Sequence, residues 1–362
     1  MHFPLATRLA CPQAVAMSAS TTPKPTASAA DSFYHLGPEQ VLQAIESLGL
    51  SCSGRQLALN SYENRVYQIG VDNDDSTIVA KFYRPARWSD AAILEEHAFT
   101  HELAELDIPA VPPLCLAGNT LHHFQGYRFA LYPFMPGRTP NLEDEGHIRQ
   151  LGRFFGRIHA VGASRSFVHR PQLDVHTFGD DAYEYLLEQR LLPRELETSY
   201  RHLGEDLLDA IEDIMDAVQA HHIRLQGDAH PGNILWQEGP QRTEGSPHIL
   251  DFDDARMGPA VQDLWMFLSG EHAQMEATLN ILLQGYTDFC DFDASELRLI
   301  EPLRSLRMMH HAAWLAKRRD DPVFLDAFPW FNTQRYWEEH LLSLKEQMAS
   351  LHEPPLRCQD NG

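Results

Sequence analysis

The sequence predicts an α+β protein in which a small antiparallel sheet with one main helix is followed by a larger, mostly helical region. Strand-like segments, rich in β-branched and aromatic residues, cluster between residues 55 and 135. Beyond residue 136, apolar residues recur at the three- and four-residue spacing of amphipathic helices. A length of 362 residues is sufficient for two domains or one large two-lobed unit.

The composition argues against two kinds of binding partner, nucleic acids and membranes. The chain has 29 Lys and Arg against 51 Asp and Glu, and this net charge of −22 argues against nucleic-acid binding through a basic stripe. No run of about 18 apolar residues occurs, so neither a membrane span nor a membrane partner is expected. The five cysteines are far apart and form no C-x-x-C pair, which favours reduced thiols and a cytoplasmic location. We expect a monomer.

The two ends of the chain are expected to be tails. Residues 1–31 are rich in Ala, Ser, Thr and Pro and show no periodicity, which predicts disorder. Translation could begin at Met17 instead of Met1. We expect a sheet-containing lobe over residues 32–135, a helical lobe over residues 136–357, and a short tail over residues 358–362.

The first lobe combines helical and strand-like segments. The predicted order is a helix at 41–50, strands within 55–72 and 76–85 around an Asp-rich turn, a helix at 91–106, and strands at 120–125 and 127–135.

The second lobe is predicted to be helical on either side of one long loop region. Helices are expected at 146–162 and 205–222, where apolar residues form a stripe along one face. The opposite face of the second helix carries several Asp and Glu residues, and we interpret it as a solvated surface. Helices resume after the loop and continue to the end.

The loop region contains a candidate catalytic and metal site. The segment 227–233, GDAHPGN, precedes an apolar strand, and a second apolar strand ends at Asp251. A hairpin of these strands would bring Asp228, Asn233 and Asp251 to one end. Carboxylate and amide oxygens suit Mg²⁺ carried with nucleotide phosphates. Asp228 could accept the proton of an attacking hydroxyl, while Asn233 and Asp251 bind the metal and Asp251 holds it against the phosphates. Taken singly, these residues could instead form a helix cap or a solvated turn.

A buried lysine is predicted in the first lobe. Lys81 lies within the apolar strand VAKF, where an unpaired charge would be costly. A strand lysine that faces a helical glutamate can grip nucleotide phosphates. We prefer Glu96 to Glu95 as its partner, because Phe99 then lies on the same helix face. The alternative is an edge-strand lysine that protects against aggregation.

These features together resemble a known superfamily. The strand lysine, the helix glutamate, LYPFMPG at 131–137, GDAHPGNIL at 227–235 and ILDFDDA at 249–255 resemble the protein-kinase-like superfamily, in its aminoglycoside and choline phosphotransferase branch. Whole blocks, among them LNSYENRVYQ and QGDAHPGNILW, are similar to bacterial stress-response Ser/Thr protein kinases. The likeness extends over residues 33–357. It implies a bilobal fold with ATP between a small and a larger lobe.

The resemblance also implies residue roles. Asp228 matches the catalytic base of the family, Asn233 and Asp251 match its magnesium ligands, and Lys81 with Glu96 matches its nucleotide-side ion pair. Ser61 matches a position that touches ATP phosphate.

The segment LYPFMPG is interpreted as a hinge. The Pro133 carbonyl and the Met135 amide would then contact adenine, and a proline is tolerable at a position that only accepts a hydrogen bond. The alternative is an ordinary apolar strand that ends in a turn.

The sequence departs from the family pattern at some positions. Gln226 stands where His is usual before Gly-Asp, and Asp253 stands where ordinary kinases have the Gly of D-F-G. Asp263 is interpreted as a structural residue that holds the backbone of the catalytic loop.

Three functions are considered. The preferred one is Mg-ATP-dependent phosphoryl transfer to Ser and Thr of proteins, with autophosphorylation, in a bacterial stress response. The alternative is a small-molecule kinase of the aminoglycoside, choline or homoserine kinase type, which would use the same catalytic core. The third is a non-catalytic binding module, and the presence of all charged catalytic positions argues against it.

Overall fold

The computed structural model describes residues 33, 36–72, 76–238 and 245–359. The chain forms two compact units, residues 1–136 and 137–362. The tail predicted at 1–31 and the alternative start at Met17 lie outside the described residues. Among the residues that are described, no helix is both long and apolar enough to cross a membrane.

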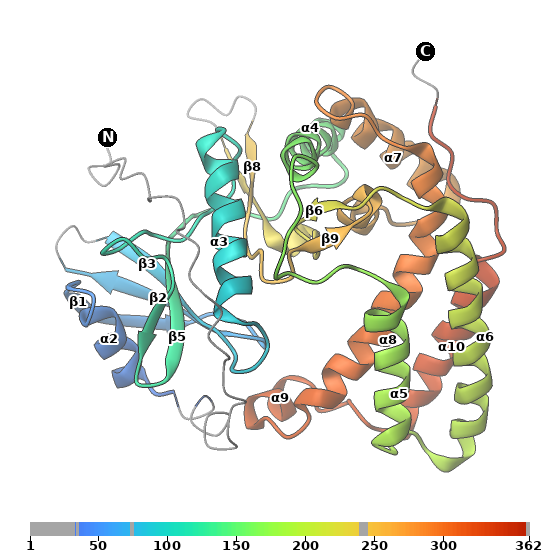
Figure 1. Cartoon of the computed structure of the whole chain (residues 1–362), viewed down its shortest axis with the longest axis horizontal. Helices are drawn as coiled ribbons and strands as arrows, with labels where there is room; N and C mark the ends of the chain where they lie inside the picture. Colours follow the sequence, from blue (N-terminus) through green and yellow to red (C-terminus); the bar gives the residue numbers. More distant parts are fainter. Residues whose placement is uncertain (1–32, 34–35, 73–75, 239–244, 360–362) are drawn as a thin grey trace. The chain divides into compact units, whose positions relative to one another are not determined.

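Over residues 36–72 and 76–136, the first unit consists of an antiparallel sheet of five strands and the helices α2 and α3 (Figure 1). The strand order is β1-β2-β3-β5-β4, and every neighbouring pair is antiparallel. The elements are α2 (Pro38–Glu46), β1 (Cys52–Ala58), β2 (Arg65–Val71), β3 (Ser76–Phe82), α3 (Asp90–Glu105), β4 (His122–Phe124) and β5 (Tyr127–Pro133). The expected strand at 127–135 ends two residues early, at a proline that cannot donate to a ladder.

The two helices contact different sets of sheet residues. Alternate residues of a strand face opposite sides of the sheet, and Ala80 and Phe82 of β3 pack in one cluster with Ile45 of α2. Ile93 of α3 packs with Tyr83, just beyond β3, in a second cluster. The main helix, α3, is capped by the Ser89 hydroxyl, which accepts a hydrogen bond from the Ala92 N–H at 3.2 Å. Residues on the second side of β3, including Lys81, therefore face the side of the sheet that carries α3.

The second unit is mostly helical. Its helices are α4 (Glu145–Gly162), a π-helical turn (His176–Asp180) that continues into α5 (Asp181–Glu188), α6 (Arg194–Val218), α7 (His272–Tyr286), α8 (Ile300–Arg318), α9 (Pro322–Ala327) and α10 (Gln334–Ser350). Short 3₁₀ segments are η2 (Pro231–Asn233), η3 (Ala260–Asp263), η4 (Trp265–Phe267) and η5 (Ala294–Leu299). Two antiparallel strand pairs join β6 (Ile223–Leu225) to β9 (Arg256–Gly258), and β7 (Ile234–Gln237) to β8 (Ser246–Ile249).

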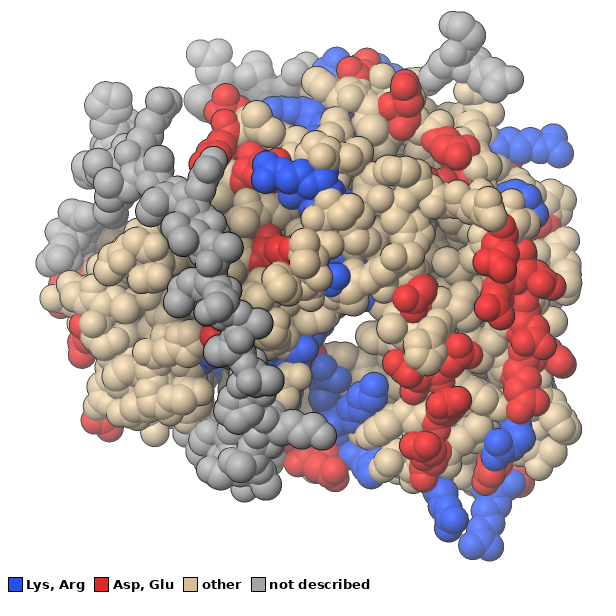
Figure 2. Space-filling model, in the orientation of Figure 1, with Lys and Arg blue, Asp and Glu red and all other residues tan. Residues whose placement is uncertain are grey.

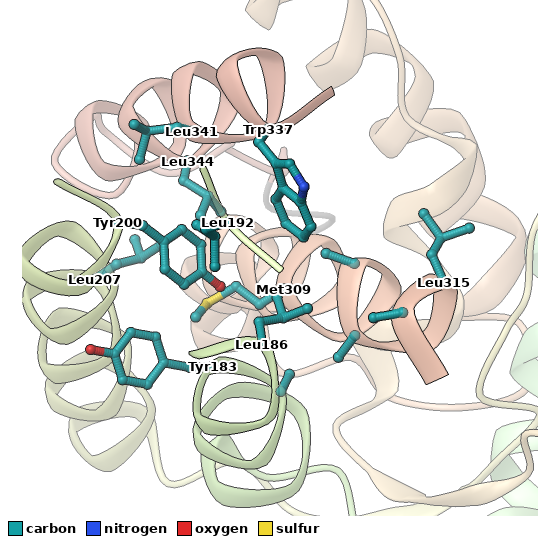
Figure 3. Packing of buried hydrophobic residues seen from close by; sticks show 14 of the residues in the cluster. Tyr183, Leu186, Leu192, Tyr200, Leu207, Met309, Leu315, Trp337, Leu341 and Leu344 are labelled. Carbon is teal, nitrogen blue, oxygen red and sulfur yellow. The ribbon is translucent and has the colours of Figure 1, made fainter. Parts of the chain in front are cut away.

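One hydrophobic core of this unit lies among α5, α6, α8 and α10 (Figure 3). Tyr200 and Leu207 of α6, Met309 of α8, and Trp337 and Leu344 of α10 are buried together. Fully burying one such side chain contributes about 1.5–3 kcal/mol. This packing supports α8, which carries residues of the site described below.

The expected acidic helix is longer than predicted. α6 begins at Arg194 instead of residue 205, and it ends at Val218 because Gln219 adopts a left-handed backbone conformation with φ of 49°. Its predicted apolar stripe is buried at Leu207, Leu208 and Ile211. Figure 2 shows Asp and Glu side chains gathered along α6 at the right of the molecule, so the predicted solvated acidic face is confirmed.

Glycines allow α4 and α7 to pack closely. A Cβ at Gly152 of α4 would lie 1.9 Å from the Leu282 carbonyl oxygen of α7. A Cβ at Gly285 of α7 would lie 2.1 Å from the Arg149 carbonyl oxygen of α4. Because backbone meets backbone at both positions, no larger residue fits without moving a helix.

Candidate active site

Lys81 and Glu96 form a buried ion pair in the first unit. Lys81 Nζ lies 3.7 Å from Glu96 Oε1, and the two residues are 5% and 2% exposed. Burying both charges is tolerated because each compensates the other. β3 lies between β2 and β5, so the alternative of an edge-strand lysine is wrong. The expected pairing with Glu96 is present, and its role toward a nucleotide stays a prediction.

The loop that carries Ser61 is held by Arg84. This loop joins β1 to β2, and the Arg84 guanidinium donates hydrogen bonds of 2.9 Å to the carbonyl oxygens of Tyr62 and Glu63. The Asn64 side chain accepts the Arg84 N–H at 3.1 Å. Within the described part of the chain the Ser61 hydroxyl makes no hydrogen bond, and its contact with phosphate stays a prediction. Sequence reasoning missed Arg84, which lies two residues beyond the end of β3.

The predicted hinge residues lie at the end of β5. Pro133 is the last residue of the strand and lies opposite Ile78 of β3, and Met135 follows outside the strand. The preceding Tyr132 is fixed by a hydrogen bond of 3.0 Å between its hydroxyl and that of Tyr83. Contact of Pro133 and Met135 with adenine stays a prediction.

In the second unit, the hairpin places Asn233 and Asp251 near each other. Ile234 of β7 pairs with Ile249 of β8, and the Leu250 N–H donates to the Asn233 carbonyl at 2.9 Å. Asn233 directly precedes β7, and Asp251 follows β8 by two residues. The predicted hairpin is therefore confirmed. The Asn233 amide group donates to the Asp228 carbonyl at 2.9 Å, which leaves its side-chain oxygen able to bind a cation.

Gln226 links the loops that carry Asp228 and Asp251. Its side-chain NH₂ donates to the Asp251 carbonyl at 2.6 Å, and its side-chain oxygen accepts the Asp228 N–H at 2.9 Å. Gln226 is fully buried. A residue that appeared only as a departure from the family pattern thus fixes the distance between two predicted site residues.

Asp263 binds the backbone of the loop that carries Gln226 and Asp228. Its two carboxylate oxygens accept the backbone N–H groups of Gln226 and Gly227, each at 2.8 Å. His159 of α4 lies 3.2 Å from Asp263 and is itself hydrogen-bonded to the Tyr286 hydroxyl at 3.0 Å. The structural role expected for Asp263 is confirmed.

A neighbouring glutamate supports the segment that carries Asp263. Glu296 of η5 accepts the Val261 N–H at 2.9 Å. Burial raises the pKa of the Glu296 carboxyl to about 7, because the ionised form is poorly solvated there.

Asp251 has an unusual backbone. Its φ of 52° lies in the left-handed region, which costs about 1–2 kcal/mol for most residues and somewhat less for Asp.

The three carboxylates at 251, 253 and 254 lie in different environments. Asp251 is exposed, Asp253 is buried, and Asp254 pairs with Arg256 at 2.8 Å. This separation reduces the repulsion that three adjacent carboxylates would otherwise produce.

The chemistry of Asn233 and Asp251 fits a hard cation. A carboxylate and an amide oxygen are ligands of Mg²⁺, which also keeps waters and substrate phosphates in its shell. Over the described ranges, no group of three or more His, Cys, Asp or Glu side chains is placed to hold a metal ion.

Arg307 contacts the predicted catalytic base. Its Nη1 lies 2.5 Å from Asp228 Oδ1, and the ring Nε2 of His230 lies 3.5 Å from Asp228 Oδ2. Arg307 belongs to α8, 79 residues beyond Asp228. Sequence reasoning missed this residue because no local pattern signals a contact over that separation.

Comparisons with known proteins agree on the kind of chemistry. Residues 55–300 match the phosphotransferase enzyme family. Stress response kinase A of Escherichia coli (strain K12) is 38% identical over 336 residues, which cover 91% of this chain and 98% of the relative. Serine/threonine protein kinase RdoA of Salmonella typhimurium (strain LT2) is 38% identical over 325 residues, which cover 90% and 96%.

Solved structures share the fold. Amicoumacin kinase, in complex with AMP-PNP and Ca²⁺, has a TM-score of 0.66 at 17% identity and covers 89% of this chain and 96% of its own. The microcompartment-associated aminopropanol kinase has a TM-score of 0.66 at 16% identity and covers 88% and 99%. At these identities the likeness concerns the fold alone.

Proposed function

The chain belongs to the phosphotransferase enzyme family, and from that premise we propose that it is a Mg-ATP-dependent kinase that phosphorylates Ser and Thr residues of proteins, its own included. We further propose that it acts as a cytoplasmic monomer in a bacterial stress response. The kinase activity itself follows from family membership. The protein acceptor, the metal, the location and the physiological role are the proposed parts.

The catalytic assignment depends mainly on one observation. Hydrogen bonds join the two loops that carry Asp228, Asn233 and Asp251. Gln226 bonds to the backbone of both Asp228 and Asp251, and Asn233 bonds to the Asp228 carbonyl. Phosphoryl transfer depends mostly on positioning and on charge stabilisation, so a rigid loop pair of this kind is what the reaction needs.

Each residue has a distinct role in the proposed reaction. Asp228 accepts the proton of the acceptor hydroxyl. At the same time the hydroxyl oxygen bonds to the γ-phosphorus, and the bond between the γ-phosphorus and the bridging oxygen breaks, so that ADP leaves. Asn233 and Asp251 would hold Mg²⁺, which neutralises phosphate charge when bound. Lys81, oriented by Glu96, binds the α- and β-phosphates, and Ser61 contacts phosphate from the loop after β1.

The relatives favour a protein acceptor. Proteins named as stress response kinase A and as a serine/threonine protein kinase match nearly their whole length at 38% identity. The alternative is a small-molecule kinase of the aminoglycoside, choline or homoserine kinase type. The fold neighbours favour it, because they include an amicoumacin kinase and an aminopropanol kinase.

The test is incubation with labelled ATP and Mg²⁺, followed by mapping of phosphosites on the protein and on a cell lysate. The expected result is Ser and Thr labelling that Asp228→Ala abolishes and that Asp209→Ala, a change of an exposed acid on α6, leaves intact. Transfer by Asp228→Ala at the wild-type rate would contradict the catalytic assignment. Faster transfer to free amino alcohols or aminoglycosides than to any protein would favour the alternative.

A further inference from the structure

We propose that a cationic groove beside Asp228 binds an acidic side chain of the acceptor, so that the enzyme selects Ser or Thr next to Asp or Glu. This inference rests on the proposed function and specifies its substrate class.

The groove lies wholly within the second unit. It has a volume of about 450 Å³, and residues from the loop after Asp228, from η4 and from α8 line it, among them His230, Trp265, Met266, Arg304 and Arg307. None of its lining residues is Asp or Glu. A hydroxyl that reaches Asp228 would therefore bring its neighbouring groups against arginine and not against carboxylate.

Arg307 provides the main charge of this groove. Its side chain is 41% exposed and donates to Asp228 through one nitrogen, and it makes no other hydrogen bond within the described residues. A guanidinium has five N–H donors arranged as a planar fork, which matches a carboxylate. Arg307 is thus placed to contact Asp228 and an acceptor carboxylate at the same time.

Arg304 forms the rim of the same surface. Its guanidinium donates to both carboxylate oxygens of Glu301, at 2.9 and 3.1 Å, and lies 5.4 Å from the centroid of the Trp265 ring. Each arginine is paired with one carboxylate, Arg304 with Glu301 and Arg307 with Asp228, but the Arg307 side chain is 41% exposed and that of Arg304 only 25%, so Arg307 is the more accessible charge. The charge that selects an acceptor therefore depends on Arg307.

The face of α8 that carries Arg304 and Arg307 continues to Arg318, with two ring side chains between these arginines. Arg304, Arg307, His311, Trp314 and Arg318 recur at three- and four-residue spacing and share one face of the helix. The Arg318 guanidinium lies 4.4 Å from the Trp314 ring centroid, and the His311 ring stacks on Trp314 at 5.7 Å. Figure 2 shows Lys and Arg side chains near the end of α8 that leads into α9, whereas α6 is covered by acidic side chains.

The arginines on this face of α8 favour an anionic acceptor over a cationic one. A choline-like or aminoglycoside acceptor is cationic and would be repelled by Arg307, whereas an acidic peptide would be attracted along the α8 face. In a chain of net charge −22, a cationic face is a local exception that favours an anionic partner.

The test uses three short fluorescent peptides that differ only in the residues around one Ser, which are Glu, Ala or Lys. Binding is measured by anisotropy, and phosphoryl transfer is measured separately with labelled ATP. We expect the Glu peptide to bind at least about tenfold more tightly than the Lys peptide, with the difference shrinking at high salt. Arg307→Gln should remove this preference, and Arg307→Lys should keep part of it.

A matched control is Arg201→Gln, since Arg201 is an arginine on α6, 45% exposed and paired with Glu197. It should leave the preference unchanged. Equal binding of the three peptides, tighter binding of the Lys peptide, or a preference that survives Arg307→Gln would overturn the inference. If the Glu peptide binds through Arg307 but no Ser or Thr is phosphorylated, the groove binds acidic side chains as inferred, and the proposed protein-kinase function fails. If proteins are phosphorylated whatever the charge of the residues beside the acceptor Ser or Thr, the proposed function holds and the inference about the groove fails.

Discussion

Gln226 donates a hydrogen bond of 2.6 Å from its side-chain amide to the main-chain carbonyl of Asp251. The same side chain accepts the N–H of Asp228 at 2.9 Å. A proposed base and a proposed metal ligand, 23 positions apart in the sequence, are therefore held through one buried side chain. Such supporting contacts set the position of groups that touch a substrate without touching it themselves.

Replacing Gln226 should impair turnover more than folding. Gln226→Ala removes both hydrogen bonds, and we expect kcat to fall by about 10- to 100-fold, as for other residues that orient ligands. Gln226→His restores a side chain that can donate and accept, and it should retain most of the activity. Steady-state kinetics with matched melting curves check this. Unchanged kcat in Gln226→Ala would show that Asp263 alone positions the loop.

The Lys81–Glu96 pair allows stability and nucleotide binding to be separated. Lys81→Met leaves Glu96 buried without this partner, and we expect the free energy of unfolding to fall by about 3–5 kcal/mol. Lys81→Met combined with Glu96→Leu should recover most of that stability. Neither variant should bind Mg-ATP as the wild type does, because the phosphate-binding cation is absent from both. Urea unfolding and calorimetric ATP titration measure the two effects, and normal ATP affinity in the double variant would refute the assigned role.

Much of this site could be predicted because its signals are local in the sequence. A lysine inside an apolar strand must be paired, and the helical spacing of Glu96 and Phe99 identifies the partner. Two apolar segments flanking a turn predict the hairpin that brings Asn233 close to Asp251.

Other features depend on contacts that no local pattern encodes. Arg307 reaches Asp228 from α8 only after the helices of the second unit have packed, and the sequence around Arg307 resembles that of any amphipathic helix. The helix at α5 was not predicted, and α6 begins earlier than expected, although Leu196, Tyr200 and Leu203 already recur at helical spacing and pack into the same core, which is a local signal that was missed.

Gly227 should be intolerant of any side chain. Its φ is +89°, and a Cβ there would lie 2.1 Å from the Asp254 carbonyl oxygen. Gly227→Ala is expected to lower the free energy of unfolding by about 3 kcal/mol or more and to abolish activity by moving Asp228. Gly49 is the control, since its φ is +83° but no atom lies within 4 Å of its Cβ position. Gly49→Ala should cost only about 1–2 kcal/mol, from backbone strain alone. Equal losses in the two variants, measured by urea unfolding, would show that the contact with Asp254 is unimportant.

Glu296 should make stability depend on pH. Its pKa is raised by burial to about 7 in the folded protein, from an ordinary value of 4.5. The folded state therefore binds a proton that the unfolded state has released between these two pH values, so stability falls as pH rises from about 4.5 to about 7 and then levels off. The loss is at most about 3 kcal/mol. Glu296→Gln keeps an acceptor for the Val261 N–H without a charge, so it should melt at a higher temperature than the wild type at pH 8 and at a similar temperature at pH 5. Asp209→Asn, the same change at an exposed site on α6, should show no such divergence, and a Glu296→Gln curve parallel to the wild type across this range would contradict the raised pKa.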